Sequence, residues 1–251
     1  MRKLTIAAVA AVMLAATAPV MTVTNGRPDG TGHPYVGIAL QPAAGGGFFD
    51  CSGSFLSPTK FLTAAHCFDP AAPAFVSPQN APPFTVVPGT VHNNPDWCFG
   101  CGSGLPGADT HDVAVITLAA SVFLPVYAAL PAAGLVDTLP MKSSVDIVGY
   151  GVQGFIRGRD PEQIFTAVRF FAPSELVQSN NRASGEFIKL TANPSKGTGG
   201  VCFGDSGGPD VLGGTNIVLA VNSYVTNGNC AGVTYSQRVD LPGILAFINS
   251  F

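Results

Sequence analysis

The most distinctive segment of this 251-residue chain reads Cys-Phe-Gly-Asp-Ser-Gly-Gly-Pro and places glycines on both sides of Ser206. Glycine tolerates backbone conformations that other residues avoid, so the segment can form a strained turn that projects the serine hydroxyl. The same turn can aim successive N–H groups at one point, as an acyl-transfer oxyanion requires. Gly-rich turns that contain a serine are common, but the full sequence Gly204 to Pro209 after Cys202 is not. It indicates a nucleophilic serine.

A second segment, Leu62-Thr63-Ala64-Ala65-His66-Cys67, ends an apolar run with a histidine and a cysteine. A disulfide from Cys67 back to Cys51 would close a loop of about fifteen residues and stabilise the fold by roughly 3 kcal/mol in the chain-entropy model. It would also hold the backbone of His66 in place. Taken alone, this histidine fits a buried structural role better than a catalytic one.

A third segment places Asp112 directly before the largely apolar run Val113 to Leu118. Burying an unpaired carboxylate is costly, so a carboxylate at this position needs a hydrogen-bond donor. The Nδ1 proton of a histidine would satisfy it. The alternative is an ordinary aspartate in the turn that begins a strand.

The remaining sequence indicates short strands that could position these groups. Glycine and proline are plentiful, at 30 and 21 residues, whereas charged residues make up only 11% of the chain. Many turns between short apolar segments, several of them alternating apolar and polar residues, favour an all-β protein. The expected strands are Tyr35 to Leu40, Phe48 to Leu56, Lys60 to Ala65, Phe84 to Val87, Val113 to Leu118, Val145 to Tyr150, Ile164 to Phe171, Phe187 to Thr191, Ile217 to Tyr224 and Val233 to Val239.

The C-terminus alone has a strong helical pattern. Asp240 can cap a helix, Pro242 suits its first turn, and apolar residues recur at helical spacing up to Phe251. We expect this helix to pack on the second half of the chain. The Pro- and Ala-rich stretch from Leu130 to Pro140 divides the expected strands into two groups.

Composition excludes several classes of function. The length and the 47% of apolar residues indicate a folded protein with one large or two small cores. A formal charge of −3, without any run of Lys or Arg, gives no basic field for nucleic acid or anionic lipid.

The first residues and the cysteines indicate export. Met1, Arg2 and Lys3 precede an apolar stretch from Leu4 to Val20, which predicts a secretory signal peptide. The alternative is an uncleaved membrane anchor, for which the stretch is short. Six cysteines in an exported chain indicate three disulfides, with fifteen pairings open. The Cys98-Phe99-Gly100-Cys101 element could be a redox or half-zinc motif, but a local disulfide is the better interpretation.

Together the three segments resemble the chymotrypsin/trypsin family of serine peptidases over about residues 23 to 251. The order His, Asp, Ser agrees with that family, whereas the subtilisin and α/β-hydrolase families order the three residues differently. The resemblance implies two packed six-stranded antiparallel β-barrels with a C-terminal α-helix. The first barrel would span about 23–135 and the second about 136–251, behind a signal peptide of residues 1–22.

The resemblance also implies the mechanism. His66 would act as general base for Ser206, and Asp112 would orient the imidazole. The N–H groups of Gly204 and Ser206 would form the oxyanion hole. Neither a metal nor an organic cofactor would take part.

By the same resemblance, Cys51 would pair with Cys67 and Cys202 with Cys230, which leaves Cys98 and Cys101 to pair locally. The substrate pocket would have Gly200 at its base, Ser223 and Val225 along one wall, and Gly232 at the rear. Without a carboxylate at its base, such a pocket favours a small to medium apolar side chain before the scissile bond over Lys or Arg.

Activation in this family requires a new N-terminus that pairs with the carboxylate before the catalytic serine, here Asp205. The matching segment is Val23-Thr24-Asn25-Gly26, which follows the signal peptide without a preceding basic residue. Export processing, with or without a short trimming step, is therefore expected to expose the terminus.

The sequence thus predicts a secreted, extracellular, monomeric serine endopeptidase that acts on proteins or peptides. No nucleic acid and no stable membrane association are expected. One alternative is a non-catalytic secreted binding protein on the same fold. Another is a serine esterase, although a lipid-active enzyme would need an apolar lid that the sequence lacks.

Overall fold

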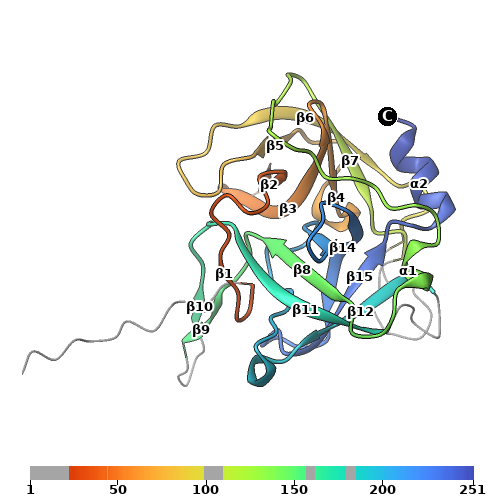
Figure 1. The fold of residues 1–251 in the computed structure, drawn as a ribbon. Coiled ribbons are helices and arrows are strands. Elements are labelled where there is room, and N and C mark those ends of the chain that lie inside the picture. Colours follow the sequence, from red (N-terminus) through yellow and green to blue (C-terminus); the bar gives the residue numbers. More distant parts are fainter. Residues whose placement is uncertain (1–22, 44, 99–109, 157–161, 179–184) are drawn as a thin grey trace, which may run out of the picture.

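Two β-barrels packed together make up the structure (Figure 1), a computed structural model that describes residues 23–43, 45–98, 110–156, 162–178 and 185–251. The predicted signal peptide, residues 1–22, lies outside these ranges. Both barrels have six antiparallel strands and both are closed, and a helix ends the chain. The predicted fold class is therefore confirmed.

The first barrel closes around an aromatic and aliphatic core. Its strands pair in the order β2-β3-β4-β7-β6-β5, and β5 returns to pair with β2. Phe55, Phe61 and Ile116 are fully buried inside it, with Phe55 and Phe61 in edge-to-face contact. The strands are β2 (Val36–Pro42), β3 (Phe48–Ser57), β4 (Lys60–Thr63), β5 (Ala74–Ser77), β6 (Val87–Asn93) and β7 (Ala114–Leu118).

The second barrel follows the order β8-β11-β12-β15-β14-β13, and β13 closes it on β8. Its core includes the fully buried Ile147, Leu176 and Leu190. Strand β1 (Arg27–Pro28) extends this sheet at β11, and β9 (Gly154–Ile156) pairs with β10 (Glu162–Ile164) as a separate sheet. The barrel strands are β8 (Ser144–Gly149), β11 (Phe170–Gln178), β12 (Phe187–Ala192), β13 (Pro209–Leu212), β14 (Val218–Val225) and β15 (Gly232–Arg238).

Contacts between the barrels are apolar and ionic. One buried cluster joins Val36 of the first barrel to Val148 and Tyr150 of the second. Beside it, the buried Arg169 side chain donates to Oδ2 of Asp29 at 2.8 Å and to the carbonyl of Val36 at 2.8 Å. Because a buried guanidinium needs several acceptors, these bonds fix how the barrels meet.

His33 belongs to the same ionic cluster, although its place in the sequence, among Gly, Thr and Pro, predicts only a surface or turn residue, as for His92 and His111; for His33 that prediction is wrong. Its Nδ1 lies 2.6 Å from Oδ1 of Asp29, and its exposed fraction is only 9%. His92 is half-buried, with Nε2 2.9 Å from the Thr117 hydroxyl, and His111 occupies a turn at φ +56°.

The strand predictions fail where proline or a turn interrupts the pattern. Strands β5 and β13 were not predicted, although Pro209 occupies the first position of β13, where a missing N–H is tolerated. The predicted strand Ile164 to Phe171 is divided between β10 and β11, because the chain turns at Ala167, whose φ is +51°. Strand β6 begins only at Val87, where the predicted strand Phe84 to Val87 ends.

The C-terminal helix α2 (Pro242–Asn249) forms as predicted, but Asp240 does not cap it. The N-cap is Leu241, and the Asp240 carboxylate instead accepts hydrogen bonds from Arg238 and from the backbone of Val136. The end of the helix contacts the first barrel rather than only the second, since Lys60 donates to the carbonyl of Ile248. The shorter helices are η1 (Ala65–Cys67), α1 (Leu135–Thr138) and η2 (Pro194–Lys196).

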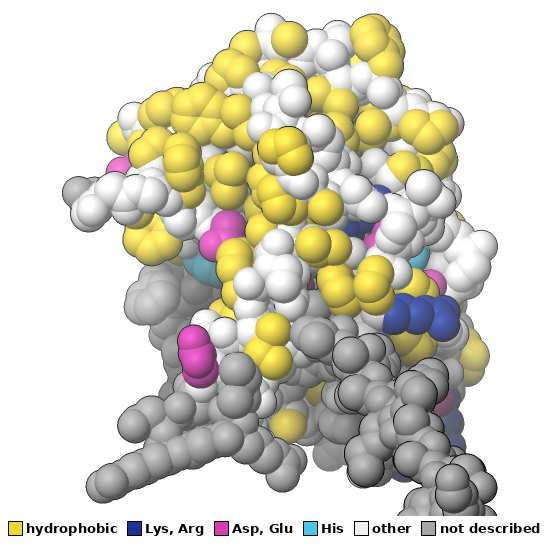
Figure 2. All heavy atoms as spheres, turned by 90° about the vertical axis from the view of Figure 1, so that its left-hand side faces the viewer, with side chains coloured by type: hydrophobic (Ala, Val, Ile, Leu, Met, Phe, Trp, Pro, Cys, Tyr) yellow, Lys and Arg dark blue, Asp and Glu magenta, His cyan; other side chains and the backbone are white. Residues whose placement is uncertain are grey.

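Charged side chains are sparse on the face seen in Figure 2, where hydrophobic and uncharged polar groups cover the part formed by the first barrel. This agrees with the 11% of charged residues in the sequence. In the described part of the chain, no helix has the length and apolar character needed to cross a membrane.

Candidate active site

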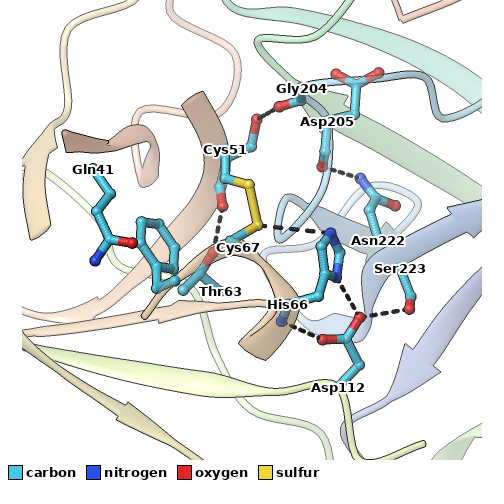
Figure 3. Close-up of a disulfide and its surroundings, with 12 residues drawn as sticks. Gln41, Cys51, Thr63, His66, Cys67, Asp112, Gly204, Asp205, Asn222 and Ser223 are labelled. Carbon is cyan, nitrogen blue, oxygen red and sulfur yellow. Dashed lines mark hydrogen bonds and ion pairs between the residues drawn. A yellow bond between two sulfur atoms is a disulfide. The ribbon is translucent and has the colours of Figure 1, made fainter. Parts of the chain in front are cut away.

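The pairing of β4 with β7 brings His66 and Asp112 together. Thr63 at the end of β4 lies opposite Ala114 at the start of β7, so the residues just beyond these ends become neighbours. Oδ1 of Asp112 accepts from the backbone N–H of His66 at 2.9 Å, and Oδ2 lies 2.7 Å from Nδ1 (Figure 3). An ionised carboxylate can only accept, so this geometry places a proton on Nδ1 and leaves Nε2 as the basic nitrogen.

A third donor to Asp112 comes from the other barrel. The hydroxyl of Ser223 on β14 donates to Oδ2 of Asp112 at 2.6 Å. The carboxylate is fully buried, and three donors replace the water that it has lost. Asp112 is therefore held from both barrels, and the imidazole is held with it.

Glycines make the turn that carries Ser206. Gly204 and Gly207 have φ values of +91° and +81°, a region that residues with a side chain rarely adopt. The backbone N–H of Asp205 donates to the carbonyl of Cys202 at 3.0 Å, and that of Gly208 donates to the carbonyl of Asp205 at 2.9 Å. Two tight turns in succession thus enclose Ser206, as its sequence pattern predicts.

The turn is docked between the barrels. The backbone N–H of Ser52 on β3 donates to the carbonyl of Ser206 at 2.8 Å, and that of Gly207 donates to the carbonyl of Asn222 on β14 at 2.8 Å. A methyl group on Gly207 would collide with the Thr63 hydroxyl and lie 2.9 Å from the nitrogen of Ala64. The serine turn therefore lies directly against the segment that ends at His66.

The two N–H groups expected in the oxyanion hole differ from their neighbours. Within the described chain, the N–H groups of Asp205, Gly207 and Gly208 all donate to backbone carbonyls, whereas those of Gly204 and Ser206 have no acceptor. Both Gly204 and Ser206 are partly exposed. Two partly exposed donors one residue apart can bind an oxygen atom that comes from outside.

Asp205 lies behind the serine turn and is fully buried. Its carboxylate accepts from the backbone N–H groups of Gly151 and Cys202, each at 2.9 Å. Burial raises the pKa of Asp205 to about 7, because these two bonds offset only part of the lost hydration and nearby Asp50 adds negative charge.

Disulfides brace both sides of the candidate site. Cys51–Cys67 and Cys202–Cys230 are formed, with S–S distances of 2.04 and 2.06 Å. Sγ of Cys67 lies 3.9 Å from Nε2 of His66. Of the predicted pair Cys98 and Cys101, Cys101 lies outside the described residues.

The structure brings together three of the four residues proposed for the substrate pocket. A Cβ built on the buried Gly200 would meet the side chains of Ala192 and Thr234. Ala192 lies opposite Gly232 across β12 and β15, and Thr234 lies opposite Val225 across β15 and β14. The side chain of the fourth, Ser223, hydrogen bonds to Asp112 instead.

Sequence reasoning did not find this contact of Ser223, nor the roles of Ser52 and Asn222 in holding the serine turn. Each lies within a strand of ordinary composition, and only the pairing of distant strands gives it a partner. The described residues contain no cluster of three or more His, Cys, Asp or Glu side chains that could hold a metal ion.

Comparison with known proteins adds a family to this geometry. A family model described as Trypsin matches residues 32–242. A solved structure of HL collagenase is similar with a TM-score of 0.68 and 21% identity, over 90% of this chain and 97% of the other. A solved structure of GrC has the same TM-score and coverage at 18% identity. No curated protein sequence matches the chain. At these identities the structural likeness shows the fold.

Proposed function

The chain belongs to the trypsin family of serine peptidases, and from that premise we propose that it is a secreted serine endopeptidase with Ser206 as nucleophile. The observation that carries the proposal is the buried Asp112 carboxylate bonded to His66, with the serine turn docked against the segment ending at His66. Substrates are proteins or peptides. The domain comprises residues 23–251, with its first barrel over about 23–135 and its second over about 136–251.

In the proposed reaction, His66 Nε2 takes the proton of Ser206 as Oγ attacks the peptide carbonyl. It then returns that proton to the leaving amine, which breaks the C–N bond and leaves an acyl-enzyme for water to hydrolyse. The negative Asp112 favours the imidazolium that forms in between. The bonds that Asp112 makes to His66 support this role, because they fix the tautomer that the first step requires.

The developing oxyanion is bound by the N–H groups of Gly204 and Ser206. Their lack of an intramolecular acceptor among the described residues supports this assignment. In a comparable hydrolase, loss of one such donor costs about 10²- to 10³-fold in rate. The chemistry calls for neither a metal nor an organic cofactor.

The acyl-side pocket accepts a small to medium apolar side chain. Gly200 contributes no carboxylate to pair with Lys or Arg, and its surroundings are the side chains of Ala192 and Thr234. Val225 narrows the entrance and Gly232 lines the rear. A library of peptide substrates varied at the residue before the scissile bond tests this, and a preference for Lys or Arg would overturn it.

Activation uses the segment Val23 to Gly26. Val23 is fully buried, and Thr24 pairs with Gly200, since the Gly200 N–H donates to the Thr24 carbonyl at 3.1 Å. We infer that removal of the signal peptide, with or without short trimming, frees an amino group that pairs with Asp205. N-terminal sequencing of the active secreted protein should find its start at or near Val23. Full activity with a start well before Val23 would contradict this.

Labelling with a fluorophosphonate tests the central proposal. The mature protein should gain a single adduct, read by intact mass, and Ser206→Ala should gain none. No adduct on the mature protein would favour a non-catalytic binding protein. Turnover of simple esters without turnover of peptides would favour an esterase.

A further inference from the structure

One face of β3 meets the serine turn and continues beyond it. Side chains alternate along a strand, so Phe48, Asp50 and Ser52 point to the same side. The Ser52 hydroxyl donates to the carbonyl of Gly204 at 2.9 Å, and a Cβ built on Gly204 would lie 2.9 Å from Oδ2 of Asp50. The Asp50 carboxylate is therefore adjacent to one of the two proposed oxyanion donors.

Among the residues that the structure describes, the Asp50 carboxylate has no cationic partner. Every ion pair of the described residues involves other side chains, and the hydrogen bond found for Asp50 is to its own backbone. Asp50 is partly buried, which raises its pKa above the ordinary value, and the nearby charged group that it affects is the negative Asp205. A cationic group of a bound molecule would stabilise the ionised Asp50 carboxylate and would also offset its repulsion of Asp205.

Asp50 lies on the side of the proposed site where the substrate chain after the scissile bond would run. In the proposed mechanism the leaving amine receives its proton from Nε2 of His66, so the chain after the scissile bond begins there. Nε2 lies 3.9 Å from Sγ of Cys67, which is bonded to Cys51, the residue after Asp50. The leaving chain thus passes the disulfide and reaches Asp50, while the proposed acyl pocket at Gly200 belongs to the second barrel.

Each of the two segments that meet at Asp50 and Gly204 carries an exposed aromatic residue. Phe48, two residues before Asp50 on the same face, is 59% exposed, and Phe203, which precedes Gly204, is 46% exposed. Lys and Arg combine an apolar stem with a cationic head, and both interact favourably with aromatic faces. An acid on segments that also carry exposed rings therefore suits a basic side chain better than a small polar one.

We propose that Asp50 selects a Lys or Arg side chain within the first two residues after the scissile bond. This inference rests on the proposed peptidase function and adds to it a substrate preference on the leaving-group side.

Acyl transfer tests this side of the site separately. The mature enzyme is acylated by a peptide ester with an apolar side chain before the ester bond, and the acyl-enzyme is divided between water and an added dipeptide amide. The amide's amine forms the new C–N bond, the bond to Ser206 Oγ breaks, and the amine proton passes through His66 to Oγ. Nucleophiles with Lys in the first or second position are compared with the same dipeptides that carry norleucine.

A hydrogen bond to a charged group predicts that Lys is preferred over norleucine by about tenfold in one of the two positions. Asp50→Asn should abolish this preference, whereas Glu175→Gln, which removes an exposed carboxylate of the second barrel, should keep it. Equal partition by the wild-type enzyme, or an unchanged preference in Asp50→Asn, would overturn the inference.

Two readouts keep the test decisive. Absence of any ester turnover would refute the proposed function rather than the role of Asp50, and the rate of fluorophosphonate labelling shows whether Asp50→Asn is folded. If that variant does not fold, salt decides the question in the wild-type enzyme. An ionic preference for Lys weakens as ionic strength rises, and a preference that salt leaves unchanged would overturn the inference.

Discussion

Asp112 and Asp205 are both fully buried beside the proposed catalytic groups, but they differ in the donors around them. Asp112 accepts from the backbone and ring of His66 and from the Ser223 hydroxyl. Asp205 accepts from two backbone N–H groups, and burial raises its pKa to about 7. The first carboxylate lies in a completed set of bonds, whereas the second lies where a positive charge would be strongly stabilised.

Asp210 extends the contrast within the second barrel. It is fully buried, and neither of its oxygens has a hydrogen-bond partner in the described chain. Burial raises its pKa to about 8, which the neighbouring Ser236 hydroxyl offsets only in part. The Asp112 carboxylate, which orients the base, is thus stabilised by donors of the protein itself. Asp205 and Asp210, in contrast, favour the protonated state or an added cation.

Asp112→Asn should have the largest effect, since it removes the charge from the completed set of bonds. The amide presents an N–H where Nδ1 needs an acceptor, so the imidazole takes the wrong tautomer. In a Ser-His-Asp peptidase this change lowers kcat by about 10⁴-fold. The rate of peptide hydrolysis tests this prediction. Asp96→Asn is the control, because Asp96 is an exposed aspartate of the first barrel. Near-normal kcat in Asp112→Asn would refute the assigned role.

The sequence was sufficient for the features that depend on short segments. The turn around Ser206 follows from its glycines, and the two β-barrels follow from the family resemblance of its motifs. The neighbours His66 and Asp112 could be expected because a buried carboxylate before an apolar strand needs a donor. In each case the residues that decide the structure lie close together in the chain.

Contacts between distant strands could not be predicted in this way. Ser223 reaches Asp112 across 111 positions of sequence, and Asp50 lies beside Gly204 only because β3 packs under the serine turn. The buried state of His33 could not be foreseen, because its partner Asp29 is bonded in turn to Arg169, which lies 140 positions away in the sequence. Such polar contacts depend on the relative position of the barrels, which no local pattern encodes.

Asp205→Asn should have the next largest effect. The carboxylate holds the backbone of Gly151 and Cys202 beside the serine turn, so its loss disturbs the N–H groups of Gly204 and Ser206. We expect kcat and the rate of fluorophosphonate labelling to fall about 10²- to 10³-fold, as for loss of one oxyanion donor.

Asp210→Asn is the matched control for Asp205→Asn, because it neutralises another fully buried carboxyl of the second barrel, one that makes no hydrogen bond to the serine turn. It should retain most activity at pH 6 to 7. Equal losses in the two variants would show that general destabilisation, and not the serine turn, explains the effect.

Asp210 should instead make stability depend on pH. Its pKa is about 8 in the folded state and near 4 in the unfolded chain, so between these values the folded state binds the extra proton. Stability therefore decreases as pH rises through this window. Between about pH 5.5 and 8, the unfolding free energy of the wild type should fall by roughly 2–3 kcal/mol more than that of Asp210→Asn.

Urea unfolding of the mature protein at both pH values measures this difference. Asp205 is present in both proteins, so the comparison removes the part of its titration that does not depend on the charge of Asp210. A parallel decrease in wild type and Asp210→Asn would show that Asp210 is not the group that loses the proton.

Ser223→Ala should have the smallest effect. It separates the contribution of the Ser223 bond to Asp112 from that of the two His66 bonds. Asp112 keeps both bonds to His66 and loses the third, so kcat should fall only about tenfold, the worth of a hydrogen bond to a charged group. The matched control is Ser54→Ala, because Ser54 is also a buried serine on a barrel strand but its hydroxyl has no partner among the described residues. If Ser223→Ala matched the loss in Asp112→Asn, the second barrel would be contributing the decisive bond to the carboxylate. If it matched Ser54→Ala, His66 alone would be sufficient to hold Asp112, and the base-orienting half of the site would belong wholly to the first barrel.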